Sequence, residues 1–137
     1  MKKVTAEWVR KAEEDYQVAV ETHRSSKPFH NTVCFHCQQA SEKYLKALLE
    51  ENGLKIPKIH DLDELCSLLL PSYQSLRSVR RGLAFLTRFA VEIRYPGDNP
   101  NKREAVAALR WTGKVRMEAR SLLGIPTIEF RPKKKRS

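Results

Sequence analysis

Apolar side chains recur along most of the chain at intervals of three and four residues, and this spacing limits the possible folds more than any other feature. The clearest stripe runs through Leu76, Val79, Leu83, Leu86, Ala90 and Ile93. Such intervals place side chains on one face of an α-helix, whereas a strand requires strict alternation. Because similar stripes cover most of the sequence, we predict an all-α fold, an antiparallel up-and-down bundle of four to five helices.

Capping and turn residues divide the sequence into five predicted helices. Short polar side chains are favoured at the start of a helix, and glycine or proline just beyond its last turn. The predicted helices run from Thr5 to about Arg24, from about Val33 to Asn52, from Asp61 to Pro71, from Ser72 or Ser75 to Arg94, and from Asn101 to about Leu122. The fourth should end within a residue of Arg94, because Pro96 cannot continue a helix.

Length and charge indicate one domain followed by a basic tail. The chain has 137 residues and is 41% hydrophobic, which suits a single core. Gly124 and Pro126 close the patterned part, so we predict a helical bundle over residues 1–124 and a tail over residues 125–137. Half of the formal net charge of +10 comes from the tail residues Arg131, Lys133, Lys134, Lys135 and Arg136. Such a tail binds polyanions without sequence preference, serves as a localisation signal, or only aids solubility.

The lack of a membrane-spanning run and the few cysteines indicate a cytoplasmic protein. No apolar run is long enough to cross a bilayer, so we expect no membrane association. Three cysteines, an odd number, favour reduced thiols over a disulfide framework. Cys34 and Cys37 lie on the apolar stripe of the second helix, so we interpret them as core residues. We predict no metal site and no cofactor.

The end of the fourth helix, where Tyr95 and Pro96 follow Arg94, is a candidate anion-binding site. Arg94 projects from the flank of the apolar stripe, toward a neighbouring helix or a second subunit. Its planar guanidinium matches the geometry of phosphate and stays charged at any working pH, so it binds phosphate well and transfers protons poorly. The pattern therefore favours binding over catalysis.

Several motifs together resemble those of the HEPN domain. They are Trp8, Ala12, Asp15 and Ala19 in the first helix, then Cys37-Gln38-Gln39-Ala40 with Glu42-Lys43-Tyr44-Leu45-Lys46-Ala47, then His60-Asp61-Leu62, and finally Arg94-Tyr95-Pro96. The resemblance spans residues 5–123. It implies an all-helical, usually dimeric bundle that is often produced beside a minimal nucleotidyltransferase in prokaryotic toxin–antitoxin pairs. It also implies nucleotide or RNA chemistry.

Ribonuclease members of that family carry an arginine and, a few variable residues later, a histidine. Arg88 matches the arginine, but Arg94 stands where the histidine would be. Three functions remain open: a module that binds nucleotide or RNA phosphate through Arg88, Arg94, Tyr95 and Lys43; a metal-independent ribonuclease with a degenerate Arg-x5-His motif; and a helical scaffold without a ligand. The missing histidine favours the first and argues against an enzyme.

The charged residues of the second helix have two interpretations. Glu42, Lys43 and Lys46 are ordinary solvent-facing charges that pair along the helix. Alternatively, Lys43 reaches the mouth of the bundle and joins Arg88 and Arg94 on one phosphate.

Two further groups of residues suggest sites on weaker grounds. His60 and Asp61 look like a metal-binding pair, but Asp61 is better explained as the cap of the third helix. A basic surface for nucleic acid requires that the fourth-helix residues, the fifth helix and the tail form one face. Its candidate residues are Arg77, Arg81, Lys133, Lys134 and Lys135.

Overall fold

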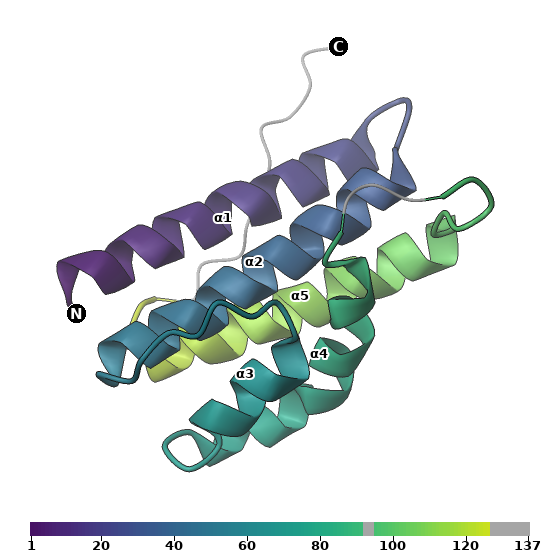
Figure 1. Ribbon diagram of the computed structural model, residues 1–137. Coiled ribbons are helices and arrows are strands. Elements are labelled where there is room, and N and C mark those ends of the chain that lie inside the picture. The colour runs from purple at the N-terminus through teal and green to yellow at the C-terminus, as the bar shows by residue number, and fades with distance from the viewer. Residues whose placement is uncertain (92–94, 127–137) are drawn as a thin grey trace.

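The computed structural model describes residues 1–91 and 95–126, and all regular structure in this part is helical (Figure 1). The α-helices are α1 (Lys3–Arg24), α2 (His30–Glu51), α3 (Leu62–Leu69), α4 (Arg80–Leu86) and α5 (Lys102–Leu122). Two 3-10 helices, η1 (Gln74–Val79) and η2 (Thr87–Phe89), flank α4. The predicted all-α bundle is confirmed.

The helix α2 lies at the centre of the bundle and contacts α1, α3 and α5 (Figure 1). Its apolar side chains include Tyr44, Leu45 and Leu48, all fully buried. Because other elements cover α2 on several sides, the helix also buries the polar side chains of Gln38 and Glu42. Burial of a polar group costs free energy unless the group is hydrogen-bonded, so these positions require specific partners.

The helix α4 packs so closely against α5 that the contact requires a glycine. A Cβ atom at Gly82 would lie 2.2 Å from ring atoms of Trp111. No side chain fits at that distance, so the absence of a Cβ atom lets α4 lie directly against α5. This contact fixes the place of η2, which follows α4 immediately.

Two predicted helix starts are confirmed. Asp61 Oδ1 accepts hydrogen bonds from the backbone N–H groups of Asp63 and Glu64, at 2.9 and 3.2 Å, and so caps α3. Asn101 and Glu104 form a reciprocal capping box at the start of α5. Both caps depend only on residues close together in the sequence, which is why the sequence identifies them.

The prediction that the first helix begins at Thr5, with this residue as its N-cap, is wrong. The helix α1 begins earlier, at Lys3, and Thr5 is a buried residue within its first turns. The Thr5 hydroxyl donates to Glu51 Oε1 at 3.0 Å, at the far end of α2. A tertiary contact has therefore replaced the local one that the sequence suggested.

The prediction of one continuous fourth helix that ends at Arg94 is also wrong. The helical structure is divided among η1, α4 and η2, and it ends at Phe89. The Thr87 hydroxyl donates to the His60 carbonyl oxygen at 3.3 Å and accepts from the Leu62 N–H at 3.1 Å. These bonds fasten the last turn to the loop before α3. Arg94 belongs to residues 92–94, outside the described residues.

The cysteines are core residues, as predicted. Cys34, Cys37 and Cys66 are buried free thiols, and burial is the main reason that the pKa of Cys37 lies above its ordinary value. Residues 1–91 and 95–126 contain no group of three or more metal-ligating side chains. No helix in that part of the chain combines the length and apolar character that a membrane crossing needs.

Candidate functional site

A network of four polar side chains joins α2 to the loop before α3. Glu42 Oε1 accepts a hydrogen bond from Gln38 Nε2 at 3.1 Å and lies 3.0 Å from His60 Nδ1. Glu42 Oε2 binds Lys46 Nζ at 2.9 Å. Gln38 Nε2 also donates to the His60 carbonyl oxygen at 3.2 Å. We call Gln38, Glu42, Lys46 and His60 the Glu42 cluster.

The members of the Glu42 cluster differ in their exposure to solvent. The side chains of Glu42 and Lys46 are 6% and 9% exposed, whereas that of His60 is 67% exposed. The ammonium group of Lys46 also lies 5.9 Å from the centroid of the Trp8 ring, which covers it from α1. The imidazole of His60 is therefore exposed to solvent, and its contact with Glu42 anchors it to a buried ion pair.

Hydrogen bonds keep the Glu42 carboxylate charged despite its burial. Burial by itself raises the pKa of Glu42, but the hydrogen bonds from Lys46, Gln38 and His60 together outweigh it and lower the pKa below its usual range. When Nδ1 of His60 donates to this carboxylate, Nε2 is the imidazole nitrogen left for a ligand or water.

The interpretation of Glu42 and Lys46 as solvent-facing charges is wrong, because both side chains are buried. Gln38, Glu42 and Lys46 follow one another at intervals of four, so they share one face of α2. That face looks polar in the sequence, but α1 and the loop that contains His60 cover it. The spacing of Gln38, Glu42 and Lys46 is the signal that could have identified the group.

A second cluster of similar composition lies between α1 and α2. Asp15 Oδ1 is 2.8 Å from His36 Nδ1, and Asp15 Oδ2 accepts a hydrogen bond from Lys43 Nζ. The side chains of Asp15, His36 and Lys43 are 12%, 23% and 24% exposed. Burial raises the pKa of Asp15, but its bonds with His36 and Lys43 outweigh this effect and lower the pKa. We call these three residues the Asp15 cluster.

Arg88 lies beside the loop that contains His60. It follows Thr87, whose hydroxyl binds the His60 carbonyl oxygen. The Arg88 side chain is 58% exposed and donates to Glu104 Oε2 at 3.0 Å. Its guanidinium carbon lies 5.3 and 5.5 Å from the ring centroids of Phe85 and Phe89. The guanidinium is thus held in place and remains accessible.

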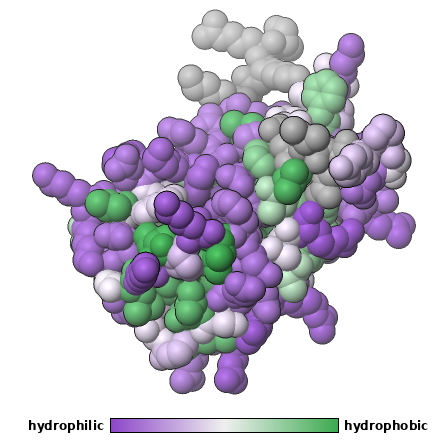
Figure 2. All heavy atoms as spheres, in the orientation of Figure 1, coloured by the Kyte–Doolittle hydropathy of each residue, from purple (hydrophilic) through white to green (hydrophobic). Residues whose placement is uncertain are grey.

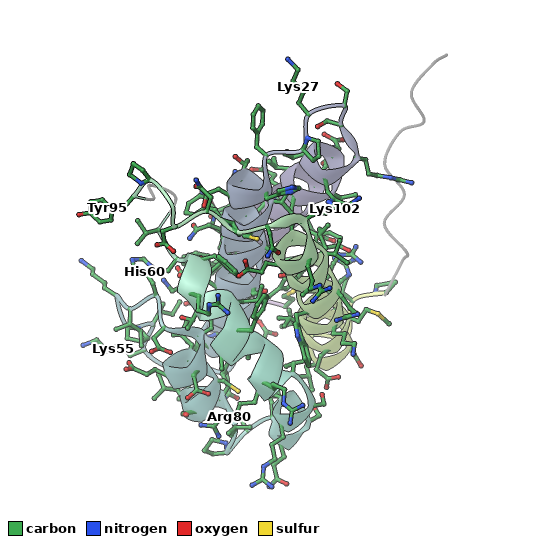
Figure 3. The ribbon with its side chains drawn as sticks, turned by 90° about the vertical axis from the view of Figure 1, so that its right-hand side faces the viewer. Lys27, Lys55, His60, Arg80, Tyr95 and Lys102 are labelled. Atoms are coloured by element: carbon green, nitrogen blue, oxygen red, sulfur yellow. The ribbon has the colours of Figure 1, made fainter. Side chains whose placement is uncertain are left out.

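The other predicted site residues are more scattered. Tyr95 is 85% exposed, and Figure 3 shows Tyr95, His60 and Lys55 extending from the same side of the molecule. Arg77 and Arg81 are exposed on η1 and α4. Lys133, Lys134 and Lys135 belong to residues 127–137, and Arg94 to residues 92–94; both segments lie outside the described residues. Lys43 pairs with Asp15 in the Asp15 cluster, whereas Arg88 pairs with Glu104.

A third network joins the C-terminal segment to the bundle. Glu13 Oε1 accepts hydrogen bonds from Arg116 Nη2 at 2.7 Å and from Arg120 Nη1 at 2.8 Å. Arg120 also donates to the carbonyl oxygen of Pro126, at 3.1 and 3.0 Å. The guanidinium groups are largely enclosed, with side-chain exposures of 8% for Arg116 and 12% for Arg120. This network ties α1, α5 and Pro126 together, and its two guanidinium groups are already bound to Glu13.

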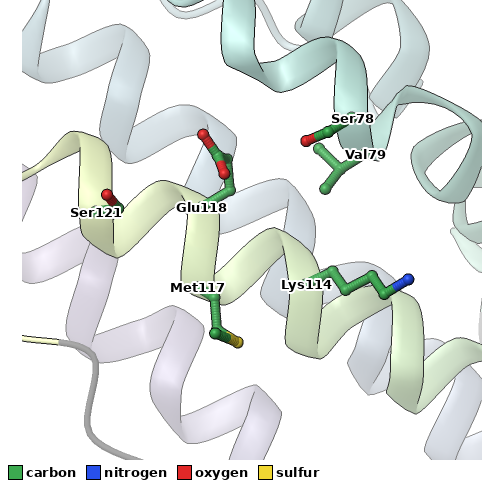
Figure 4. Close-up of a pocket in the computed structure, with 6 residues that line it drawn as sticks. All are labelled: Ser78, Val79, Lys114, Met117, Glu118 and Ser121. Atoms are coloured by element: carbon green, nitrogen blue, oxygen red, sulfur yellow. The ribbon is translucent and has the colours of Figure 1, made fainter.

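A surface groove between η1 and α5 is unrelated to these clusters (Figure 4). Its volume is about 490 Å³, and it is lined by Ser78, Val79, Lys114, Met117, Glu118 and Ser121. None of these lining residues belongs to the Glu42 cluster or to the predicted phosphate site. The groove brings together no set of groups that would define a ligand.

A family model matches most of this chain, and two solved structures match its fold. The model of the HEPN domain matches residues 5–122, which is most of the chain. The chain belongs to the HEPN family. The Gln38-to-Lys46 face, the His60 loop and the Arg88 turn all lie within this HEPN domain. The search of curated proteins found no match.

Two solved structures share the HEPN fold with this chain. TT1696 from Thermus thermophilus has a TM-score of 0.75 and 20% sequence identity, and the match covers 88% of this chain and 98% of TT1696. ST0689, described as an archaeal HEPN homologue, has a TM-score of 0.72 and 20% identity, with 90% of this chain and 99% of ST0689 covered. At this level of identity, the likeness establishes the fold.

Proposed function

We propose that this HEPN domain binds the phosphate group of a nucleotide or of RNA without hydrolysing it. The proposal further holds that the domain acts as a homodimer and is the partner of a minimal nucleotidyltransferase in a toxin–antitoxin-type pair. The principal phosphate-binding residues are Arg88 and Arg94, with Tyr95 stacking on a base and Lys43 adding charge.

The observation that carries the proposal is the setting of Arg88. Its guanidinium is braced by two aromatic rings and is still 58% exposed, so a phosphate reaches it without opening the core. Its ion pair with Glu104 lies at the surface, where such pairs contribute at most about 1 kcal/mol. A phosphate that makes charge-assisted hydrogen bonds with the arginine fork competes well with a surface pair of this kind.

The remaining residues support the site to different degrees. Tyr95 is exposed near Arg94 in the sequence and offers a flat ring for a nucleobase. Lys43 is bound by Asp15, so its contribution requires the loss of that ion pair. We therefore assign Lys43 the smallest share of the binding energy.

Membership in the HEPN family supports the proposed homodimer and partner. A second copy would double the number of arginines at a shared site, which suits a polyanion such as RNA. Co-expression with a nucleotidyltransferase encoded by a neighbouring reading frame tests the pairing. Co-purification at a fixed stoichiometry is the expected result, and separate elution of the two proteins would contradict it.

Removal of the Arg88 guanidinium tests the binding function directly. We expect Arg88→Ala to weaken binding of a short labelled oligouridylate by about tenfold, because charge-assisted hydrogen bonds contribute about 1.5–3 kcal/mol. Fluorescence anisotropy measures the affinity for RNA, and calorimetry measures that for AMP. Added salt should weaken RNA binding in the unaltered protein.

The matched control is Arg80→Ala. Arg80 also forms an exposed pair with a carboxylate, Asp63, at 2.9 Å, so its removal changes net charge and surface pairing in the same way. We expect Arg80→Ala to change affinity by less than about twofold. Equal losses in the two variants would show attraction by overall charge, and no binding by the unaltered protein would overturn the proposal. Cleavage of the RNA that Arg88→Ala abolishes would favour the ribonuclease alternative.

A further inference from the structure

The imidazole of His60 is anchored at one nitrogen and open at the other. Nδ1 lies 3.0 Å from Glu42 Oε1, and Gln38 binds the carbonyl oxygen of the same residue. With the side chain 67% exposed, the anchored ring directs Nε2 away from the buried carboxylate. A surface histidine with no role beyond solubility needs neither of these bonds.

The charges of the Glu42 cluster favour an anion at this open nitrogen. Glu42 is already compensated by Lys46, with the two charged atoms 2.9 Å apart and both side chains buried. A proton on His60 therefore gives the cluster a net positive charge, and the exposed imidazole is where a ligand meets it. An imidazolium here would donate through Nδ1–H to Glu42 and through Nε2–H to the ligand.

The surroundings of His60 are also basic. Lys55 and Lys58 are exposed in the same loop, and Arg88 follows the Thr87 residue that binds this loop. The exposed acidic neighbour, Asp61, is turned toward the first N–H groups of α3. Figure 2 shows hydrophobic side chains gathered over the loop before α3, so the ligand also meets an apolar surface beside these charges.

We propose that His60 binds a phosphate of the ligand through Nε2, and that Glu42 is the positioning residue that orients the imidazole. This inference rests on the proposed function, because it adds His60 to the site formed by Arg88. The shared chemistry is a phosphate group, which either a mononucleotide or an RNA strand supplies. The buried members of the Glu42 cluster thus hold the His60 side chain in the orientation that binds the ligand.

The His36 imidazole provides the natural comparison. It is bonded through Nδ1 to a carboxylate in the same way, but it lies on α2, is only 23% exposed and contacts the Phe35 ring edge-on. A ligand cannot approach His36 as it approaches His60. The same substitution at both positions therefore separates ligand binding from the loss of a carboxylate–histidine contact.

The experiment measures binding of a short labelled oligouridylate, AMP and inorganic phosphate to the full chain and to His60→Asn and His36→Asn. The asparagine amide retains a donor near the position of Nδ1 and lacks a group at the position of Nε2. We expect His60→Asn to weaken RNA binding by about tenfold and His36→Asn by less than about twofold. Comparison of the three probes shows whether the phosphate comes from a nucleotide or from RNA.

Binding as a function of pH provides a second measurement. The charge of a phosphodiester is constant near neutral pH, so oligouridylate isolates the titration of the protein. Histidine changes charge between about pH 5 and 8. The ordinary pKa values of carboxylates, lysine and arginine lie outside this range. These are the side-chain types of the charged neighbours of His60, which are Glu42, Lys46, Arg88, Lys58 and Asp61. We therefore expect binding to weaken as pH rises in the unaltered protein, and His60→Asn to reduce this dependence.

Each result decides between the two proposals. Normal, equally pH-dependent binding by His60→Asn would overturn the role of His60 and leave the proposed function intact. No binding of any of the three probes by the unaltered protein would overturn both. Loss of binding in His60→Asn counts in favour only when its thermal unfolding matches that of the unaltered protein. If His60→Asn unfolds early, His60→Gln replaces it: its neutral amide keeps a donor near the position of Nε2, so we expect RNA binding that depends less on pH than in the unaltered protein, and an unchanged pH dependence would overturn the role of His60.

Discussion

The Glu42 cluster and the Asp15 cluster use the same three kinds of side chain and differ in which of them meets solvent. Each contains a carboxylate that is paired with a lysine and has an oxygen close to a histidine Nδ1 atom, at 2.8 Å in the Asp15 cluster and 3.0 Å in the Glu42 cluster. In the Asp15 cluster all three side chains are partly covered. In the Glu42 cluster the carboxylate and lysine are nearly inaccessible and the histidine is exposed.

This difference has a simple structural origin. Both members of the pair Asp15–His36 belong to long helices that pack side by side, so their contact is enclosed. His60 instead comes from a loop and reaches the buried Glu42 from outside. The accessibility of the imidazole therefore depends on the segment that carries it: a loop leaves His60 exposed, and two packed helices largely enclose His36.

The largest expected difference between the clusters concerns the free energy of unfolding. Glu42→Ala leaves the buried Lys46 ammonium without its carboxylate, so we expect a loss of about 3–5 kcal/mol. Asp15→Ala should cost about 1–3 kcal/mol, because His36 and Lys43 are more exposed and regain contact with water. Urea denaturation measures both values. Equal losses, or a larger loss for Asp15→Ala, would break the distinction between the clusters.

A smaller effect is expected in the acid range. The folded-state pKa values of Glu42 and Asp15 are lowered, so each carboxylate adds stability above its unfolded pKa and that stability is lost as pH falls through the folded pKa. The ordinary pKa values are 4.5 for Glu42 and 3.8 for Asp15, so the stability that Glu42 contributes begins to be lost at the higher pH.

Denaturation at a series of pH values checks this order. We expect Glu42→Gln to remove the part of the stability loss that begins at the higher pH. Asp15→Asn should remove the part that begins at the lower pH. The unaltered protein is the reference for both slopes. An acid slope that neither substitution changes would show that other carboxylates control acid unfolding.

The smallest expected effect is that of the histidines on stability. His36 is largely enclosed, so His36→Asn should cost about 1 kcal/mol of unfolding free energy. His60 is exposed, so His60→Asn should change it by no more than about 0.5 kcal/mol. This order is the reverse of the order expected for RNA binding. A result in which His60→Asn destabilises the protein more would contradict this order and show that the His60 contact contributes to stability.

Sequence reasoning identified the local features of the fold well. Apolar spacing predicted the five helices, and Asp61 and Asn101 were identified as caps because their partners are two or three residues away. It failed at Thr5 and at the end of η2, where contacts with Glu51 and with His60 replaced local ones. Sequence reasoning could not anticipate contacts between residues so far apart.

The candidate site shows the same division. The sequence drew attention to Arg88 and Lys43, and the structure places them in different surroundings, one exposed on η2 and the other bound to Asp15. Sequence reasoning missed the pairing of Glu42 with His60, two residues that lie eighteen positions apart. That pairing exists only because the loop before α3 returns along α2.

The sequence by itself determined that this chain forms a helical HEPN domain, because helical spacing and capping are local properties of the residues. Tertiary structure alone decided which charged side chains are enclosed and which are accessible. The exposure of a side chain depends on the segments that cover it, and those segments come from distant parts of the chain. Thus two similar sets of charged residues became an enclosed contact in one place and an exposed imidazole in the other.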